Sequence, residues 1–239
     1  GLVDDADVEG DGVCDCLKIA SIGRAGAFGD GELAFREWPN ARAQNHVVAL
    51  ESAELTDARL APYDVLIVLN VSSSKSTSED VPQREFTDSE VSAFERWVRA
   101  GGGAITTAGY GADQAKDVAN VNRLLAPFGL GYSTSKIGLN GMISSWVQHP
   151  LTQGVQRVYT EVGAEPDGMA ALTLATDANQ RAALQVPKAD GPRIVVWGDE
   201  WITYGSQWRA QVDQQVERFW LNSLGWLSRA SSCQKSVQR

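Results

Sequence analysis

Long apolar runs, clusters of basic residues and cysteines are all scarce in this sequence of 239 residues. The longest strongly apolar run, Val65 to Leu69, falls far short of the roughly 20 residues that cross a bilayer, so we expect no membrane span. Lysine and arginine number 21 against 30 acidic residues, which gives a net charge of −9. This charge argues against nucleic acid and against an anionic membrane as partners.

The overall composition is that of a folded globular chain. An apolar fraction of 43% and a charged fraction of 21% exclude a disordered or fibrous protein. A chain of this length buries a substantial core without help from disulfides or metals. We therefore expect one large domain or two small ones.

Acidic residues gather at the N-terminus, where residues 1–16 read GLVDDADVEGDGVCDC. Carboxylates fall at every second position there, with a glycine between two of them. Ca²⁺ prefers six to eight oxygen ligands, and calcium loops supply them from alternating carboxylates with a glycine at the sharp turn. We expect one Ca²⁺ in this loop. Its expected ligands are Asp5, Asp7, Glu9, Asp11 and Asp15.

The loop resembles the short Asp-rich calcium repeats of thrombospondin type 3 modules, in which D-x-D-x-D-G-D-G-V-x-D recurs. The EF-hand pattern fits less well, because position 12 counted from Asp5 is Cys16 rather than Glu. An acidic, solvated tail without a bound ion is the alternative. Loops of this kind imply abundant calcium and a compartment outside the cytosol, so we expect a secreted, cell-surface or periplasmic protein whose leader precedes this sequence.

After residue 16, short apolar runs alternate with amphipathic segments. Strands are predicted at Leu17–Gly23, Asn45–Glu51, Tyr63–Val71, Ala104–Ala108, Ala170–Ala175, Ala182–Val186 and Arg193–Trp197. Helices are predicted from a Thr87/Glu90 capping box to about Gly101, from about Asp113 to Pro127, and from about Ala210 onward.

This alternation predicts an α/β domain with a flavodoxin-like, doubly wound fold, in which a mostly parallel sheet carries helices on both faces. The domain is expected to cover residues 17–230. The Asp-rich loop of residues 1–16 precedes it, and a tail of residues 231–239 follows it.

Five phrases of the body occur in a distinctive order. They are YDVLIV, FTDSEVSAFERWVRAGGGAITTAGYG, NRLLAPFGL, HPLTQGV and VVWGDEW before FWLNSLGWLS. In this order they resemble class I glutamine amidotransferase-like domains, most nearly the branch without amidotransferase activity that includes the trehalose-utilisation (ThuA-like) proteins. The resemblance covers about residues 17–228 and implies the same α/β fold.

The resemblance also implies an active site that has lost its two central residues. An amidotransferase needs a Cys on the turn after the fourth strand, where this chain has Thr107 to Gly111 (TAGYG). It needs a His after a late strand, where this chain has Gly198-Asp199-Glu200. Neither His46 nor His149 is placed to substitute for that base. We therefore expect no glutamine hydrolysis.

Candidate ligand-binding residues follow the carboxyl ends of the predicted strands, because open α/β sheets bind ligands at that edge. These candidates are Arg24, Asn70, Tyr110, Asp199, Glu200 and Trp201. Two adjacent acids with an Arg and a Tyr suit a polyol, a sugar or, with further ligands, a metal. Alternatively, an Arg–carboxylate pair only ties the loops together.

The sequence leaves three functions open. The first is a non-catalytic binding or interaction domain of a secreted, calcium-binding bacterial protein, with a carbohydrate or another protein as its partner. The second is a carbohydrate-acting enzyme of the ThuA-like type, with Asp199 or Glu200 as its acid or base. The third is a structural or assembly module. No catalytic residue is assigned, and the oligomeric state stays open.

The three cysteines predict one disulfide. Cys14 and Cys16 are too close in sequence to pair with each other without strain. In a doubly wound fold the closing helix ends at the sheet edge where the first strand begins, so Cys233 reaches Cys14 or Cys16. We favour Cys14, because Cys16 abuts the strand. Three free thiols are the alternative.

Overall fold

The computed structural model describes residues 17–23, 37–39, 47–50, 53–73, 77, 83–109, 111, 113–138, 141–143, 145–204 and 215–228. Several residues singled out in the sequence lie outside this set. They are the expected Ca²⁺ ligands Asp5, Asp7, Glu9, Asp11 and Asp15, the cysteines Cys14, Cys16 and Cys233, and Arg24, His46 and Tyr110. The predictions on these residues stay predictions.

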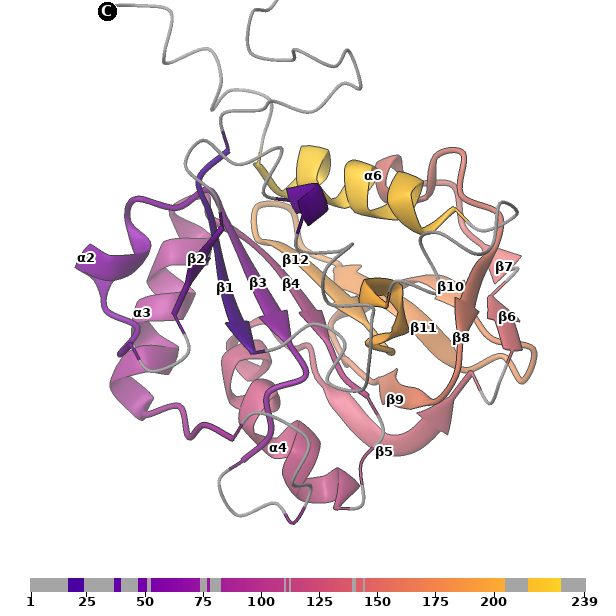
Figure 1. Cartoon of the computed structure of the whole chain (residues 1–239), viewed down its shortest axis with the longest axis horizontal. Coiled ribbons are helices and arrows are strands. Elements are labelled where there is room, and N and C mark those ends of the chain that lie inside the picture. The colour runs from indigo at the N-terminus through magenta and orange to yellow at the C-terminus, as the bar shows by residue number, and fades with distance from the viewer. Residues whose placement is uncertain are drawn as a thin grey trace, which may run out of the picture.

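An eight-stranded sheet forms the centre of the fold (Figure 1). The parallel half runs in the order β2 (Val48–Ala49), β1 (Ile19–Gly23), β3 (Val65–Leu69), β4 (Gly103–Thr107) and β12 (Arg193–Trp197). Beyond β12 the sheet continues antiparallel through β11 (Ala182–Pro187), β10 (Ala171–Thr176) and β7 (Ser145–Trp146). The parallel half has the 2-1-3-4-5 order of flavodoxin-like folds, which confirms the predicted fold class.

Four α-helices and three 3₁₀ turns are described with both ends, and residues 37–39 are also helical. The helices are α2 (Asp57–Leu60), α3 (Asp88–Arg99), α4 (Gln114–Leu125) and α6 (Val216–Ser228). The turns are η1 (Ala126–Phe128), η2 (Pro150–Thr152) and η3 (Trp201–Thr203). The capping box predicted for α3 is present, since Thr87 Oγ1 accepts from the Glu90 amide and Glu90 Oε2 accepts from the Thr87 amide.

Helices cover both faces of the sheet, as predicted. On β3, the alternate residues Val65, Ile67 and Leu69 belong to a core shared with α6. Leu66 and Val68 belong to the opposite core, which contains buried residues of α3 and α4. Because both faces of β3 are buried, its sequence is a continuous apolar run rather than an alternating one.

Two small sheets lie outside the predicted pattern. They pair β5 (Tyr132–Ile137) with β9 (Gly163–Pro166), and β6 (Gly141–Ile143) with β8 (Val158–Thr160). The sequence did not predict these strands or β7. In β5 only the two end residues are buried, so no two-residue alternation of apolar side chains marks the strand.

Helix α6 ends at the amino edge of the parallel strands. Arg193 at the start of β12 donates to the carbonyl of Trp226, and a Cβ on Gly103 at the start of β4 would lie 2.5 Å from the Leu227 carbonyl oxygen. The predicted Cys14–Cys233 disulfide, which lies outside the described residues, requires α6 to end at this edge of the sheet. Within the described residues, no helix is long and apolar enough to span a membrane.

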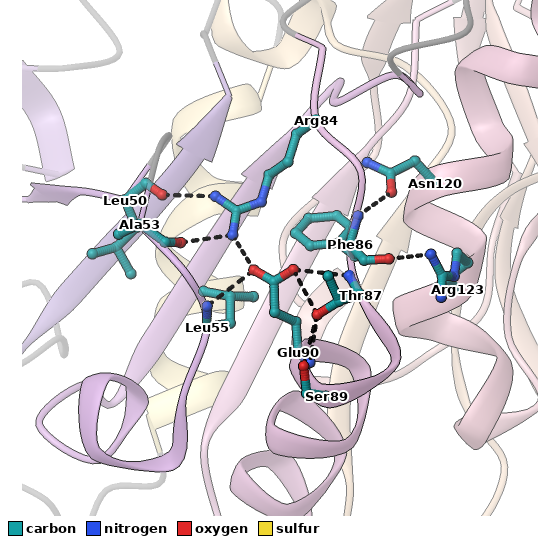
Figure 2. Close-up of polar contacts among 10 residues, drawn as sticks. All are labelled: Leu50, Ala53, Leu55, Arg84, Phe86, Thr87, Ser89, Glu90, Asn120 and Arg123. Atoms are coloured by element: carbon teal, nitrogen blue, oxygen red, sulfur yellow. Dashed lines mark hydrogen bonds and ion pairs between the residues drawn. The ribbon is translucent and has the colours of Figure 1, made fainter.

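A buried ion pair joins α3 to the segment before α2 (Figure 2). Arg84 contacts Glu90 and also donates to the carbonyls of Leu50 and Ala53 at 3.0 and 2.6 Å. Glu90 Oε1 accepts from the Leu55 amide at 3.0 Å. Burial alone would raise the pKa of Glu90, but the amides of Thr87 and Leu55 together with Arg84 outweigh it and leave that pKa below its usual value.

Candidate functional site

Asn70 joins the end of β3 to the end of β4. Its backbone N–H donates to the Thr107 carbonyl at 3.1 Å, and its side-chain Oδ1 accepts from the Gly109 amide, also at 3.1 Å. Asn70 has a left-handed backbone with φ of 43°, which Asn tolerates better than most residues but which still costs free energy. The two hydrogen bonds hold the residue in that conformation.

Glu200 reaches the same place from the end of β12. Its Oε2 accepts from Asn70 Nδ2 at 2.6 Å, and its Oε1 lies 3.5 Å from the Tyr204 hydroxyl. A Cβ on Gly109 would come within 2.9 Å of Glu200 Oε1 and 3.0 Å of Asn70 Nδ2, so any larger residue would push on this hydrogen-bonded pair. The side chain of Glu200 is only 6% exposed. The ends of three parallel strands therefore meet around one buried carboxyl group.

Asp199 is fully buried beside Glu200. Its Oδ2 accepts from the Glu161 amide at 2.8 Å, and its Oδ1 accepts from the Trp201 amide at 3.2 Å. These bonds tie the end of β12 to the end of β8. We call Asn70, Gly109, Asp199, Glu200 and Tyr204 the strand-end cluster.

Both carboxyl groups of the strand-end cluster have raised pKa values. Burial raises the pKa of Asp199 to about 8, against the opposing effect of the Trp201 amide and with a smaller contribution from the negative charge of Glu200. Burial also raises the pKa of Glu200 to about 7, although the hydrogen bonds from Asn70 and Tyr204 favour its ionised form. Near neutral pH these groups hold protons that ordinary carboxyls have lost.

Side chains and backbone close the turn after β12. A Cβ on Gly198 would lie 2.3 Å from Ile137 Cδ1, and one on Gly163 would lie 1.7 Å from the Gly198 carbonyl oxygen. The Thr203 hydroxyl donates to the Glu200 carbonyl at 2.7 Å and fixes η3 over the turn. The Ile137 side chain of β5 and the backbone of β9 therefore pack directly against Gly198, which precedes Asp199.

The structure brings together three of the residues predicted from the sequence and leaves two undescribed. Asn70, Asp199 and Glu200 lie in the strand-end cluster, and Trp201 follows on η3. The half-buried Trp201 ring stacks on the Tyr204 ring at 4.2 Å. Arg24 and Tyr110 lie outside the described residues.

Sequence reasoning missed Tyr204 and the Glu161 amide. Tyr204 lies four residues after Glu200 and returns over it only because η3 forms between them. Glu161 follows β8, a strand that no sequence pattern predicted. The glycines around position 109 were the one available signal, because they indicate a close backbone approach.

At the carboxyl ends of the parallel strands, the described residues present two carboxyl groups and the Asn70 side-chain amide but no Cys or His. Ala108 and Gly109 follow β4 where an amidotransferase has its nucleophile, and Asp199 and Glu200 follow β12 where it has its base. Among all described residues, no group of three or more His, Cys, Asp or Glu side chains is arranged to hold a metal ion. The described polar atoms of Asn70 and Glu200 bind each other and their neighbours.

No protein-family model and no curated protein sequence matches this chain. Solved structures do match it. The N-terminal domain of mmIFT52 has a TM-score of 0.64 at 15% identity, and the match covers 89% of this chain and 97% of that one. The cytoplasmic protein STM1381 from Salmonella typhimurium LT2 has a TM-score of 0.62 at 15% identity, and the match covers 88% of this chain and 99% of that one.

A ThuA-like protein from Bacteroides uniformis ATCC 8492 has a TM-score of 0.55 at 13% identity, and the match covers 88% of this chain and 91% of that one. At identities this low, the matches show a shared fold but say nothing of a shared activity. The chain therefore shares the α/β fold of these proteins, a ThuA-like protein among them.

Proposed function

We propose that this chain is a non-catalytic binding or interaction domain of a secreted, calcium-binding bacterial protein. One observation carries the non-catalytic part. At the strand ends, where this fold places ligands, Glu200 and Asn70 are buried and hydrogen-bonded to each other. Polar atoms that are already paired inside the protein are not available to a substrate.

The strand-end cluster supports the fold instead. The Asn70–Glu200 hydrogen bond joins β3 to β12 across β4, and the Asp199 carboxyl joins the turn after β12 to the end of β8. Removing one partner leaves a buried polar group without its hydrogen bond, which typically costs about 1–3 kcal/mol. On this view substitutions that remove one of these hydrogen-bonding partners, such as Asn70→Ala, lower stability and abolish no reaction.

The calcium and secretion parts of the proposal rest on the sequence of residues 1–16. Alternating carboxylates and turn glycines there have the ligand spacing of calcium loops. The ion would stiffen the segment before β1 and would supply no chemistry at the strand ends.

A carbohydrate-acting enzyme is the second candidate, because the pKa of Asp199 is about 8 and that of Glu200 about 7. Protonated carboxyls near neutral pH are what a general acid needs. Such an enzyme would have to move η3 away from Glu200 to admit a substrate.

Turnover assays separate the two candidates. The purified chain is incubated with glutamine, with nitrophenyl esters and with nitrophenyl glycosides, alongside the Glu200→Ala variant. We expect no rate above the buffer background for the unsubstituted chain. A rate that disappears in Glu200→Ala would overturn the non-catalytic proposal and favour the enzyme.

A further inference from the structure

A groove of about 1140 Å³ lies away from the strand-end cluster. Its lining runs from Trp146 of β7 through η2 to Arg157 before β8, and within this stretch only the buried Leu151 does not contribute. In Figure 1 this segment lies beside α6, at the upper right of the molecule. The polar and aromatic lining residues used below are Trp146, Gln148, His149, Gln153, Gln156 and Arg157.

Helix α6 and the residue before it hold the groove backbone from one side. Gln215 Oε1 accepts from the amides of Gln156 and Arg157 at 2.5 and 3.0 Å. Asn222 Nδ2 donates to the Gln153 carbonyl at 2.8 Å. The backbone of the lining is therefore fixed without using the side chains of Gln153, Gln156 or Arg157.

Trp146 also holds the groove backbone in place. Its Nε1 donates to the carbonyls of Ile143 and Gln156 at 3.2 and 2.9 Å, and its ring stacks on the buried Trp197 ring at 6.2 Å. A backbone held in this way loses little conformational entropy when a ligand binds.

The lining presents donors and acceptors that the fold does not use. In the part of the chain that the structure describes, the exposed side-chain amides of Gln148, Gln153 and Gln156 have no hydrogen-bond partner. His149 Nδ1 accepts from the Leu151 amide, which puts the hydrogen of the neutral imidazole on Nε2. Burial lowers the pKa of His149 and favours that neutral form.

The chemistry of these side chains points to a ligand rich in hydroxyl groups. Each carboxamide both donates and accepts hydrogen bonds, as a hydroxyl group does. Among the lining residues that the structure describes, Arg157 is the only charged side chain and none carries a carboxylate, although the chain carries −9 overall. The groove therefore suits a neutral or anionic ligand and disfavours a cation. The indole of Trp146 adds an apolar surface for the C–H faces of a sugar ring.

We infer that this groove binds a neutral or acidic oligosaccharide, an inference that rests on the proposed function because it gives a binding domain its ligand. The volume exceeds the roughly 300–1,000 Å³ of ordinary small-molecule pockets, which leaves room for several linked sugars.

A peptide fits the same surface less well. Strand β7 lies at the edge of the sheet, but it has only the residues Ser145 and Trp146, too few to template an added strand. Among the described lining residues, Val147, which is 51% exposed, is the one large aliphatic side chain that faces solvent. The groove thus offers little to the apolar side chains of a peptide.

Calorimetric titration of the full chain tests this inference. The probes are cellotetraose, mannotetraose, xylotetraose, chitotetraose and tetragalacturonate, with an unstructured peptide of Gly, Ser and Ala as the comparison. We expect at least one saccharide to bind. The double variant Gln153→Ala/Gln156→Ala should raise its Kd about tenfold or more, because two sets of neutral hydrogen bonds are lost while the backbone contacts to α6 remain.

Two further variants, one in the groove and one outside it, test whether the effect on binding is specific to the groove. Arg157→Ala should weaken binding, whereas Arg59→Ala, which removes an exposed arginine of α2 on the far side of the sheet, should leave it unchanged. Failure of all five saccharides to bind, equal Kd values for the double variant and the unsubstituted chain, or preferential binding of the peptide would each overturn the inference. A Glu200-dependent rate would overturn the proposed function alone, since it reports on a different edge of the sheet.

Discussion

Replacing Glu200 with Gln should flatten part of the dependence of stability on pH. The glutamine oxygen can still accept from Asn70, and its NH₂ group can face the Tyr204 hydroxyl oxygen. The variant therefore resembles the protonated form of Glu200 at every pH. In the unsubstituted chain the carboxyl ionises near pH 7 when folded and near pH 4.5 when unfolded. Between those values the folded state holds a proton that the unfolded state has lost.

The sign and size of the effect follow from that difference. A carboxyl with a raised pKa stabilises the fold fully below its unfolded pKa, and this stabilisation is lost as pH rises toward the folded pKa. One pKa unit is worth about 1.4 kcal/mol, so the rise from 4.5 to about 7 corresponds to about 3 kcal/mol. Between pH 4.5 and pH 8, the free energy of unfolding of Glu200→Gln should therefore rise by about this much relative to that of the unsubstituted chain.

Urea unfolding at a series of pH values, followed by tryptophan fluorescence, measures the effect. Glu54→Gln is the matched control, because Glu54 is exposed and has no place in the strand-end cluster. We expect the free energies of unfolding for Glu200→Gln and the unsubstituted chain to diverge as pH rises, and those for Glu54→Gln to run parallel to the unsubstituted chain. A constant difference across the pH range would refute the argument that Glu200 is protonated in the fold.

Three further predictions concern other parts of the chain. Glu90→Ala leaves the largely buried Arg84 without its counter-charge and should cost up to about 3–5 kcal/mol in urea unfolding, whereas the exposed pair lost in Glu95→Ala should cost under about 1 kcal/mol. Asp7→Ala should remove the calcium-dependent rise in melting temperature while the α/β domain stays folded, and calorimetry without calcium binding to the unsubstituted chain would contradict the loop prediction. Peptide mapping without reduction should find Cys233 joined to Cys14 and a single free thiol, and reduction should lower stability by about 4–5 kcal/mol; three free thiols would contradict the bridge.

The parallel half of the fold was predictable because its local signals agree with its packing. Val65 to Leu69 form a continuous apolar run, as a strand buried on both faces must. Thr87 and Glu90 form the capping box that starts α3. The strands β5 to β9 lacked such signals, because β6 to β9 have only two to four residues each and the interior of β5 is not buried.

The candidate site was predictable only as a set of residues at one edge. The fold rule places Asn70, Asp199 and Glu200 at the carboxyl ends of parallel strands, and the structure places them there. The rule does not say whether such side chains face solvent or each other. Asn70 and Glu200 are 130 residues apart, and their hydrogen bond depends on the glycine at position 109 and on the turn η3. Both are features of tertiary packing.

The titratable groups together predict where on the pH scale the fold is most stable. The lowered pKa of Glu90 gives a stabilisation that is present above about pH 4.5 and lost as pH falls through its folded pKa. The lowered pKa of the half-buried His149 gives a second stabilisation, which is lost as pH falls below 6.5. The raised pKa values of Asp199 and Glu200 have the opposite effect. The stabilisation that they give is lost as pH rises from about pH 4 to pH 7 or 8. Two buried carboxyls outweigh one half-buried imidazole, so stability should be highest near pH 4 and fall toward pH 8. The same urea titrations measure this, and a maximum at or above pH 7 would show that burial does not keep Asp199 and Glu200 protonated.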